Sequence, residues 1–253
     1  MLKKIFWYPI SNNEKVEKYQ KIIREKEWYD ISKYILEKSN FLDVGCGAGY
    51  AMMKAKEDHD CCVFGVDPEP GAHGVGRYIK DFVNKVEIKK GAAEKLPFYD
   101  NYFEIVYCSH VLEHVNDEKK SLKEIKRVIK ENGVLIIGMP TSSMAFINLI
   151  SQILFTTHIK IFGFLFNLFS KQCFNKFLAI FRISSHSYPR ANSIWYDIKN
   201  YKISRWKKLI EEEFEILEVK KPFLYPYPDF PQFFKIHKNR FFSSSVFFIC
   251  SKK

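Results

Sequence analysis

The sequence lacks paired cysteines, and it lacks an uninterrupted apolar run long enough to span a membrane. Its six cysteines include no C-x-x-C pair, and several fall within apolar runs, which indicates reduced residues in a core. The apolar run at the N-terminus is too short for the core of a signal peptide, and charged residues soon follow it. We therefore expect a cytoplasmic protein without disulfides.

Acidic residues are absent between Asn132 and Tyr196, although the chain contains 29 Asp and Glu residues. The cations in that stretch are Lys160, Lys171, Lys176, Arg182 and Arg190. The net charge of +11 favours an anionic partner. Most of the positive charge comes from Lys, however, and an AT-rich genome produces such a composition without any selected partner. Arg, which suits bidentate phosphate binding, is sparse. The position of the charge is therefore more informative than its total.

Apolar runs alternate with helix-like segments along most of the chain. The predicted strands are 41–45, 61–67, 86–90, 103–109, 133–140, 214–220 and 245–252, and the predicted helices include 51–57, 117–132 and 204–213. Continuous apolar strands separated by helices are typical of a parallel sheet that is covered on both faces. The pattern predicts an α/β fold with a doubly wound, Rossmann-like sheet.

Several segments lie outside a minimal sheet domain. Residues 1–38 form a predicted helical preface, and the domain at 39–253 carries a hydrophobic helical insertion at 141–200, after the fifth strand. A Pro-rich and aromatic loop at 222–242 follows the sixth strand. Because ligands of such sheets bind outside the carboxyl ends of the strands, we expect the insertion and this loop to select the substrate.

A glycine-rich turn follows the first predicted strand. Gly45, Gly47 and Gly49 alternate with other residues, so the backbone can approach a ligand without an intervening Cβ. A dinucleotide fingerprint G-x-G-x-x-G that starts at Gly45 would require glycine at position 50, where Tyr50 stands. The register of the glycines therefore argues against a dinucleotide.

Two acids accompany this turn. Asp43 precedes the first glycine, where a carboxylate suits a cofactor with a cationic amino-acid end and would repel a pyrophosphate. Asp67 ends the second predicted strand, where it can accept hydrogen bonds from both ribose hydroxyls. A role as a turn or cap residue is the structural alternative for each acid taken alone.

Four segments resemble, in order, the motifs of class I S-adenosylmethionine-dependent methyltransferases. They are LDVGCGAGY, FGVDPEP, GAAEKLPFYDNYFEIVYCSHVLEHV and IKENGVLIIGMP, which cover roughly residues 39–140. The resemblance is to the broad group that methylates small metabolites and lipids. It implies S-adenosylmethionine as the cofactor and a seven-stranded sheet, mostly parallel, with an antiparallel last strand.

The resemblance also implies roles for individual residues. Those that would hold the amino-acid end of the cofactor are Asp43, Gly45, Cys46, Gly47 and Gly49. Asp67 would hold the ribose. The family usually has an Asp that contacts the adenine amino group, and this sequence has Ala92 at that position. Adenine contact would then rest on the backbone near Ala93 and Glu94 and on apolar packing.

The segment His110–His114 formally matches the zinc-protease motif H-x-x-E-H. Such a site needs the motif within a helix and a further ligand, whereas here the segment follows a buried strand, so we expect no metal. Ser109 and His110 are instead expected beside the sulfonium of the cofactor. His110 is a candidate general base, with packing against the cofactor as its alternative role. Glu113 and His114 are predicted to start the next helix.

Methyl transfer is an in-line displacement. Alignment of the acceptor with the methyl group can lower the activation barrier by up to roughly 7–11 kcal/mol. A general base is needed only where the acceptor must lose a proton. The other candidate bases are His73, His158, His186 and His237.

The insertion has two interpretations. It can form a helical lid whose apolar side covers the cleft, or residues 141–183 can contact an anionic membrane surface at the inner face. Either one favours a partly apolar acceptor, and we expect methyl transfer to oxygen on a small or lipid-linked molecule.

Two alternatives to this function are an RNA methyltransferase and a cofactor-binding protein without catalysis. The positive charge motivates the first and Ala92 the second. A nucleic-acid partner is not expected, because the fourth strand is not followed by the N/D-P-P-Y/F segment of many base methylases.

Overall fold

The computed structural model describes residues 13–71, 86–165, 185, 193–225 and 242–253. Seven strands form one sheet in the order β3-β2-β1-β4-β5-β7-β6. The strands are β1 (Asn40–Val44), β2 (Cys62–Asp67), β3 (Glu87–Lys90), β4 (Phe103–Ser109), β5 (Ile129–Pro140), β6 (Phe214–Lys220) and β7 (Ser245–Lys252). The first five pair in parallel, and β7 is antiparallel to both β5 and β6. The predicted fold class is confirmed.

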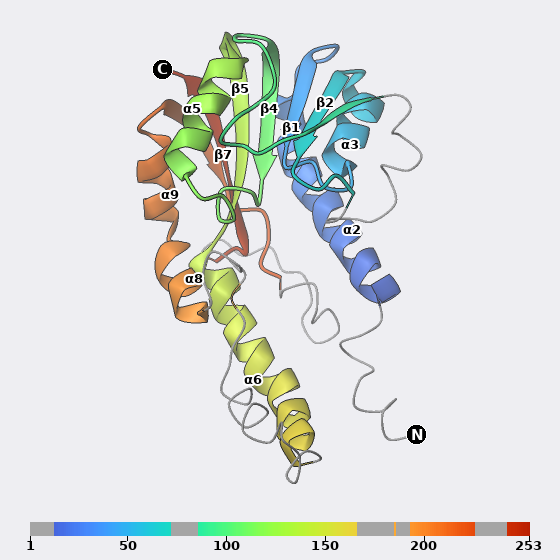
Figure 1. Cartoon of the computed structure of the whole chain (residues 1–253), viewed down its shortest axis with the longest axis vertical. Coiled ribbons are helices and arrows are strands. Elements are labelled where there is room, and N and C mark those ends of the chain that lie inside the picture. The colour runs from blue at the N-terminus through green and yellow to red at the C-terminus, as the bar shows by residue number, and fades with distance from the viewer. Residues whose placement is uncertain (1–12, 72–85, 166–184, 186–192, 226–241) are drawn as a thin grey trace.

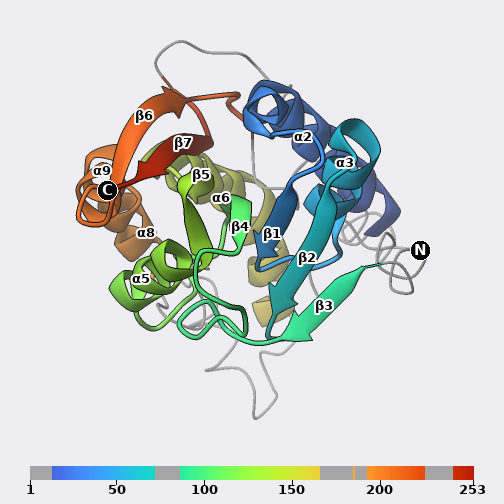
Figure 2. The same ribbon diagram turned by 90° about the horizontal axis from the view of Figure 1, so that it is seen from above.

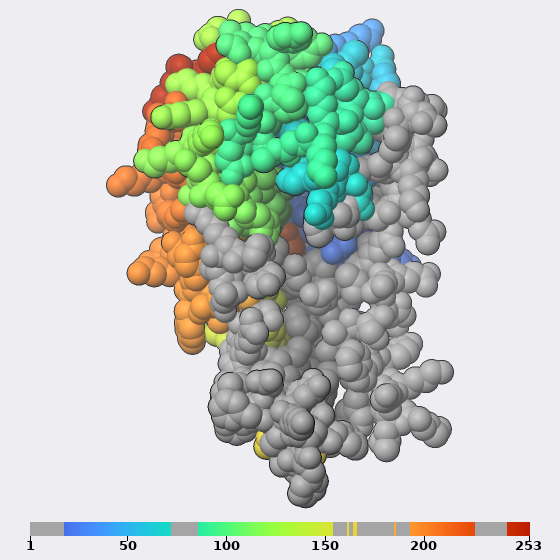
Figure 3. All heavy atoms as spheres, in the orientation of Figure 1, coloured from blue at the N-terminus to red at the C-terminus, as the bar shows by residue number. Residues whose placement is uncertain are grey.

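Helices cover both faces of the sheet. They are α2 (Asn13–Ile31), the short 3-10 helix η1 (Ser32–Tyr34), α3 (Tyr50–His59), α5 (Glu118–Val128), α6 (Ser142–Leu165), α8 (Ile194–Asn200) and α9 (Ile203–Ile210). Figure 2 shows α2 and α3 on one face and α5 and α9 on the other. Seen from the side in the space-filling view, the segment from β3 to α5 forms much of the visible surface (Figure 3).

Two apolar clusters form the core, one on each face. Trp28 of α2 and Met52 of α3 pack in the first, and Leu122 of α5 and Trp206 of α9 pack in the second. The central strands are buried on both sides, which explains why they appear in the sequence as continuous apolar runs.

Three helices end earlier than predicted. The helix predicted at 204–213 is α9, which ends at Ile210. The helix predicted at 117–132 ends at Val128, because Ile129 adopts an extended conformation and pairs with Phe103 at the start of β5. Pairing with a neighbouring strand thus overrides the helical spacing of residues 129–132. The N-terminal helix ends at Ile31, before Lys38, and η1 follows it.

The insertion leaves the sheet where we expected it. α6 begins just after the carboxyl end of β5 and extends away from the sheet (Figure 1). The backbone N–H of Thr141 donates to the carbonyl of Ser244 at 3.1 Å, and that of Ser244 donates to Phe223 at 2.8 Å. The start of the insertion and the described ends of the β6–β7 connection therefore meet at one edge.

Within the described residues, no helix is long and apolar enough to cross a membrane. Most of the insertion after α6, at 166–184 and 186–192, lies outside the described part of the chain, as do residues 226–241 of the β6–β7 connection.

Candidate cofactor site

The glycine turn connects β1 to α3 with a backbone that other residues adopt poorly. Gly45, Gly47 and Gly49 have φ angles of 74°, 48° and 75°. The N–H of Gly45 donates to the carbonyl of Val66 at 2.7 Å, which holds the turn against the end of β2. A Cβ on Gly45 would lie 2.3 Å from Cγ2 of Val111. The turn therefore requires glycine at this position for both its backbone angle and its space.

Asp67 fixes the turn from the neighbouring strand. Its side chain is buried, its Oδ2 accepts the N–H of Gly47 at 2.9 Å, and its Oδ1 accepts the N–H of Glu69 at 2.7 Å. A carboxylate oxygen has a further lone pair, so both oxygens can also accept from ribose hydroxyls. This is the turn role that the sequence left as the alternative for Asp67. Its partner Gly47 could not be predicted, because the two residues meet only when β1 and β2 lie side by side.

Asp43 lies buried at the end of β1. Burial raises the pKa of its carboxyl group well above the ordinary value, the charge of Asp67 raises it further, and the charge of Arg24 opposes them. A cationic ligand beside Asp43 would favour the ionised form of its carboxyl group. The ammonium group of S-adenosylmethionine meets that need, so the residues present fit this cofactor.

The other residues assigned to the cofactor by resemblance lie on adjoining loops. Cys46 is buried next to the first glycine, and burial raises the pKa of its thiol. Ala93 is buried, and its neighbour Glu94 accepts the N–H of Asn116 at 2.9 Å. Glu94 thus connects the loop after β3 to the loop after β4, while its contact with adenine stays a prediction.

Ser109 and His110 lie at the carboxyl end of β4, as predicted. Ser109 pairs with Gly138 of β5, and the N–H of His110 donates to the carbonyl of Gly138 at 2.9 Å. His110 has a φ of 57°, and such backbones in residues other than glycine are uncommon and cluster at functional sites. Its Nδ1 lies 3.3 Å from Oε1 of Glu113. A proton on Nδ1 that faces this carboxylate makes Nε2 the basic nitrogen.

The prediction that Glu113 and His114 start a helix is wrong. They lie in a turn, and α5 begins at Glu118, after Asp117 accepts the N–H of Lys120 at 2.9 Å as its N-cap. Asp117 provides the carboxylate that a helix start needs, whereas the carboxylate of Glu113 is buried in the turn.

A protease-like metal site would need its histidines within a helix, and the segment His110–His114 is not helical. Among the described residues, no group of three or more His, Cys, Asp or Glu side chains is placed to hold a metal. His73, His186 and His237 lie outside the described residues, and of His158 only the backbone is described.

Two residues that the sequence did not single out lie close to this edge. Nη1 of Arg24 donates to Oε2 of Glu27 at 2.7 Å, and both belong to α2. Oε1 of Glu27 accepts the hydroxyls of Tyr225 at 2.8 Å and Ser245 at 2.6 Å. In the sequence, an Arg and a Glu three residues apart resemble an ordinary surface pair on a helix, so only the fold reveals that Glu27 is buried.

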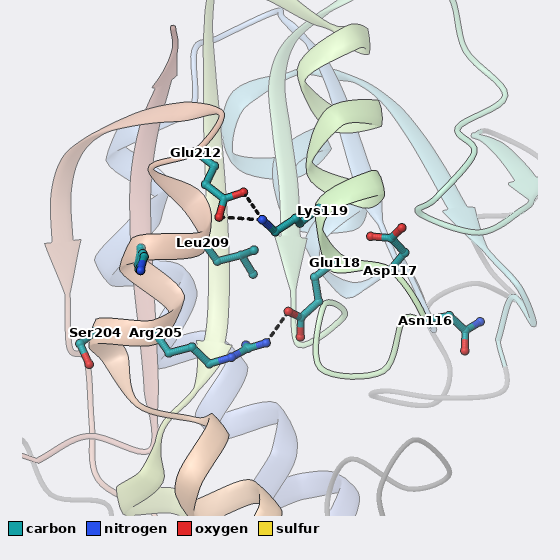
Figure 4. A pocket seen from close by; sticks show the side chains of 9 residues that line it. Asn116, Asp117, Glu118, Lys119, Ser204, Arg205, Leu209 and Glu212 are labelled. Atoms are coloured by element: carbon teal, nitrogen blue, oxygen red, sulfur yellow. Dashed lines mark hydrogen bonds and ion pairs between the residues drawn. The ribbon is translucent and has the colours of Figure 1, made fainter.

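A groove between α5 and α9 is separate from this site (Figure 4). Ion pairs cross it, from Lys119 to Glu212 at 2.7 Å and from Arg205 to Glu118 at 2.5 Å. None of the residues of the glycine turn line it. Four of its charged side chains are therefore paired with one another.

A family model described as "Methyltransferase domain" matches residues 42–137. This match covers the glycine turn, both acids and the end of β4. The chain carries a class I S-adenosylmethionine-dependent methyltransferase domain.

Curated relatives of this methyltransferase domain share about a third of its residues. The chain is 34% identical over 113 residues to a tRNA U34 carboxymethyltransferase of Nautilia profundicola. The aligned residues make up 44% of this chain and 38% of the relative. It is 28% identical over 134 residues to the uncharacterized methyltransferase YcgJ of Bacillus subtilis, with 51% and 53% covered. The chain thus spans about half, or less, of the length of these relatives.

Solved structures share the fold over most of the chain. A TehB-like SAM-dependent methyltransferase from Corynebacterium glutamicum has a TM-score of 0.51 at 14% identity, covering 96% of this chain and 100% of that one. The YcgJ protein of Bacillus subtilis has a TM-score of 0.50 at 15% identity, with 90% and 96% covered. At these identities the likeness concerns the fold alone.

Proposed function

We propose that the protein transfers the methyl group of S-adenosylmethionine to an oxygen atom of a small or lipid-linked acceptor. The observation that carries the proposal is the position of α6, whose apolar side chains begin at the sheet edge that holds the candidate cofactor site. A partly apolar acceptor would reach the site along this helix.

When bound, the cofactor supplies an electrophilic methyl group. The glycine turn and Asp67 would hold the cofactor in place, so that an acceptor oxygen could approach the methyl group in line. Nε2 of His110 would accept the proton that a hydroxyl acceptor must lose when it is methylated. The carboxylate of Glu113, whose Oε1 lies 3.3 Å from Nδ1, would hold the imidazole ring in this orientation.

α6 exposes an apolar face. Phe146, Ile153, Ile161 and Leu165 are exposed, while Met144 and Leu149 are buried against the domain. At 100° per residue the four exposed side chains fall on one broad side of the helix. An exposed apolar stripe of this kind marks an interaction surface.

The charge of the insertion, taken from its sequence, supports an anionic membrane as the partner. No acid occurs from Asn132 to Tyr196, and the cations in this stretch can meet anionic headgroups. Each Lys or Arg near an anionic membrane contributes about 1 kcal/mol, so several together give weak, reversible and salt-sensitive binding. Residues 141–183 would then bring the site to a lipid-linked acceptor.

Sedimentation with anionic vesicles at low and high salt tests this contact. We expect binding at low salt and release at high salt. The test variant changes Lys160, Lys171, Lys176 and Arg182 to Glu, and the control variant makes the same charge change at Lys90, Lys95, Lys120 and Lys123 on the sheet domain. Loss of binding only in the first variant supports the proposal. If the protein does not bind at low salt, or if both variants bind equally, the membrane proposal is wrong and the lid over a soluble acceptor is the interpretation that stays.

The names of the relatives favour RNA as a second candidate acceptor. Several are called tRNA U34 carboxymethyltransferases, which weakens the expectation that nucleic acid is not a partner. Incubation with methyl-labelled cofactor and separate lipid, glycan and RNA extracts distinguishes the candidates. We expect label in the lipid fraction. Label in RNA contradicts the proposed acceptor and leaves the methyltransferase activity intact.

A further inference from the structure

The ion pair between Arg24 and Glu27 lies on α2, outside the residues 42–137 that match the family model. The side chain of Glu27 is 2% exposed and that of Arg24 is 33% exposed. Glu27 is therefore the buried end of the pair, and Arg24 is the end that a ligand can still reach.

Glu27 is anchored on three sides. It accepts hydrogen bonds from Arg24 of its own helix, from Tyr225 after β6 and from Ser245 at the start of β7. Burial alone would raise its pKa, but Arg24, His110 and these two hydroxyls outweigh burial, and the pKa is lowered. The carboxylate is thus a fixed anion that sets the position of Arg24.

Arg24 acts electrostatically on the cofactor residues. Its charge opposes the rise in the pKa of Asp43, and it opposes the rise that burial causes in the pKa of Tyr107 on β4. The bond to Glu27 uses one of the five N–H donors of the guanidinium. Glu27 also binds Ser245, which pairs with Pro140 at the carboxyl end of β5, so its partner Arg24 lies at the same edge of the sheet as the carboxyl group of Asp43.

The amino-acid end of S-adenosylmethionine carries an ammonium and a carboxylate. Asp43 and Asp67 suit the ammonium but repel the carboxylate, so a complete site needs a cation beside them. We infer that Arg24 binds the carboxylate of the cofactor and that Glu27 is the positioning residue that orients it. This inference depends on the cofactor and not on the acceptor.

Titration calorimetry with S-adenosylmethionine and with its decarboxylated analogue, which lacks only the carboxylate, tests the assignment. The wild type should bind the analogue more weakly than the cofactor. Arg24→Met should weaken binding of the cofactor about tenfold to a hundredfold, the worth of a charge-assisted hydrogen bond, and leave the analogue unchanged. Lys21→Met, an exposed cation one turn away on α2, is the matched control and should change neither.

Arg24→Met leaves the carboxylate of Glu27 buried without its cation and can unfold the protein. The double variant Arg24→Met with Glu27→Gln removes both charges, and its amide oxygen can still accept from Tyr225 and Ser245. It should fold and show the same loss of preference for the carboxylate. Glu27→Gln alone should fold and show a smaller loss of this preference, because Arg24 remains but is no longer held.

An equal loss of affinity for both ligands in the Arg24 variants, or no loss for either, overturns the inference. An unchanged preference in Glu27→Gln overturns the positioning role of Glu27. Failure of the wild type to bind S-adenosylmethionine contradicts the cofactor itself, and failure of lipid methylation with normal cofactor binding contradicts only the proposed acceptor. The outcomes are therefore distinguishable.

Discussion

Asp43→Asn should separate cofactor binding from stability. The folded protein without ligand holds this carboxyl with a pKa well above its ordinary value of 3.8. A group whose pKa is raised on folding stabilises the fold while it is protonated, and this contribution is lost as the pH rises through the folded pKa. At neutral pH the carboxyl of Asp43 therefore favours the fold less than a neutral side chain of similar shape would.

The expected magnitude follows from these opposing effects. Removal of an unfavourable functional charge commonly adds about 1 kcal/mol to the free energy of unfolding. A gain of this size raises the Tm of a domain of this size by about 2–4 °C. The same substitution would remove the charge-assisted hydrogen bond that we predict between Asp43 and the ammonium of the cofactor. Such a bond is worth about 1.5–3 kcal/mol, so cofactor binding should weaken about tenfold to a hundredfold.

Thermal unfolding from acid to neutral pH, combined with calorimetry, measures both quantities. The gain in Tm over the wild type should be largest at neutral pH and vanish in acid, and it should shrink when the wild type is saturated with cofactor. An unchanged or lower Tm at neutral pH, together with normal cofactor affinity, would refute the reasoning about Asp43.

Two further substitutions test the turn. Asp67→Ala should weaken cofactor binding tens-fold and lower the Tm, because it removes the acceptor of two backbone N–H groups, and each N–H left unpaired costs about 1–3 kcal/mol. The control Asp60→Ala, at an exposed site, should leave the affinity unchanged. Equal affinities of the two variants would contradict the role of Asp67. Gly45→Ala should destabilise the fold by about 1–3 kcal/mol in denaturant unfolding, because the added Cβ overlaps Val111. Gly71→Ala should cost less, because Gly71 has a similar φ but no atom lies within 4 Å of the added Cβ. Similar losses at both glycines would mean that backbone strain, and not the overlap, decides.

The sequence predicted the strands best where local pattern alone defines them. The bounds predicted at 103–109, 214–220 and 245–252 coincide with β4, β6 and β7. β4 and β7 are apolar runs buried in the middle of the sheet, and polar residues bound them. The glycine turn was predictable for a similar reason, because its backbone angles demand a rare residue type.

The parts that were missed depend on residues distant in the sequence. The early start of β5 at Ile129 depends on its pairing with Phe103, and the bond from Gly47 to Asp67 depends on the neighbouring strand. Glu27 and Tyr225 are separated by most of the chain and meet only at the sheet edge. No periodicity within one helix could have revealed that Glu27 is buried there.

Titration calorimetry of the purified protein with S-adenosylmethionine, and separately with NAD, tests the cofactor most directly. Binding of one molecule of S-adenosylmethionine per chain with micromolar affinity is predicted, weakened in Asp43→Ala and in Asp67→Ala, with no binding of NAD. Binding of NAD, or an affinity for S-adenosylmethionine that neither variant changes, would contradict the account of the site.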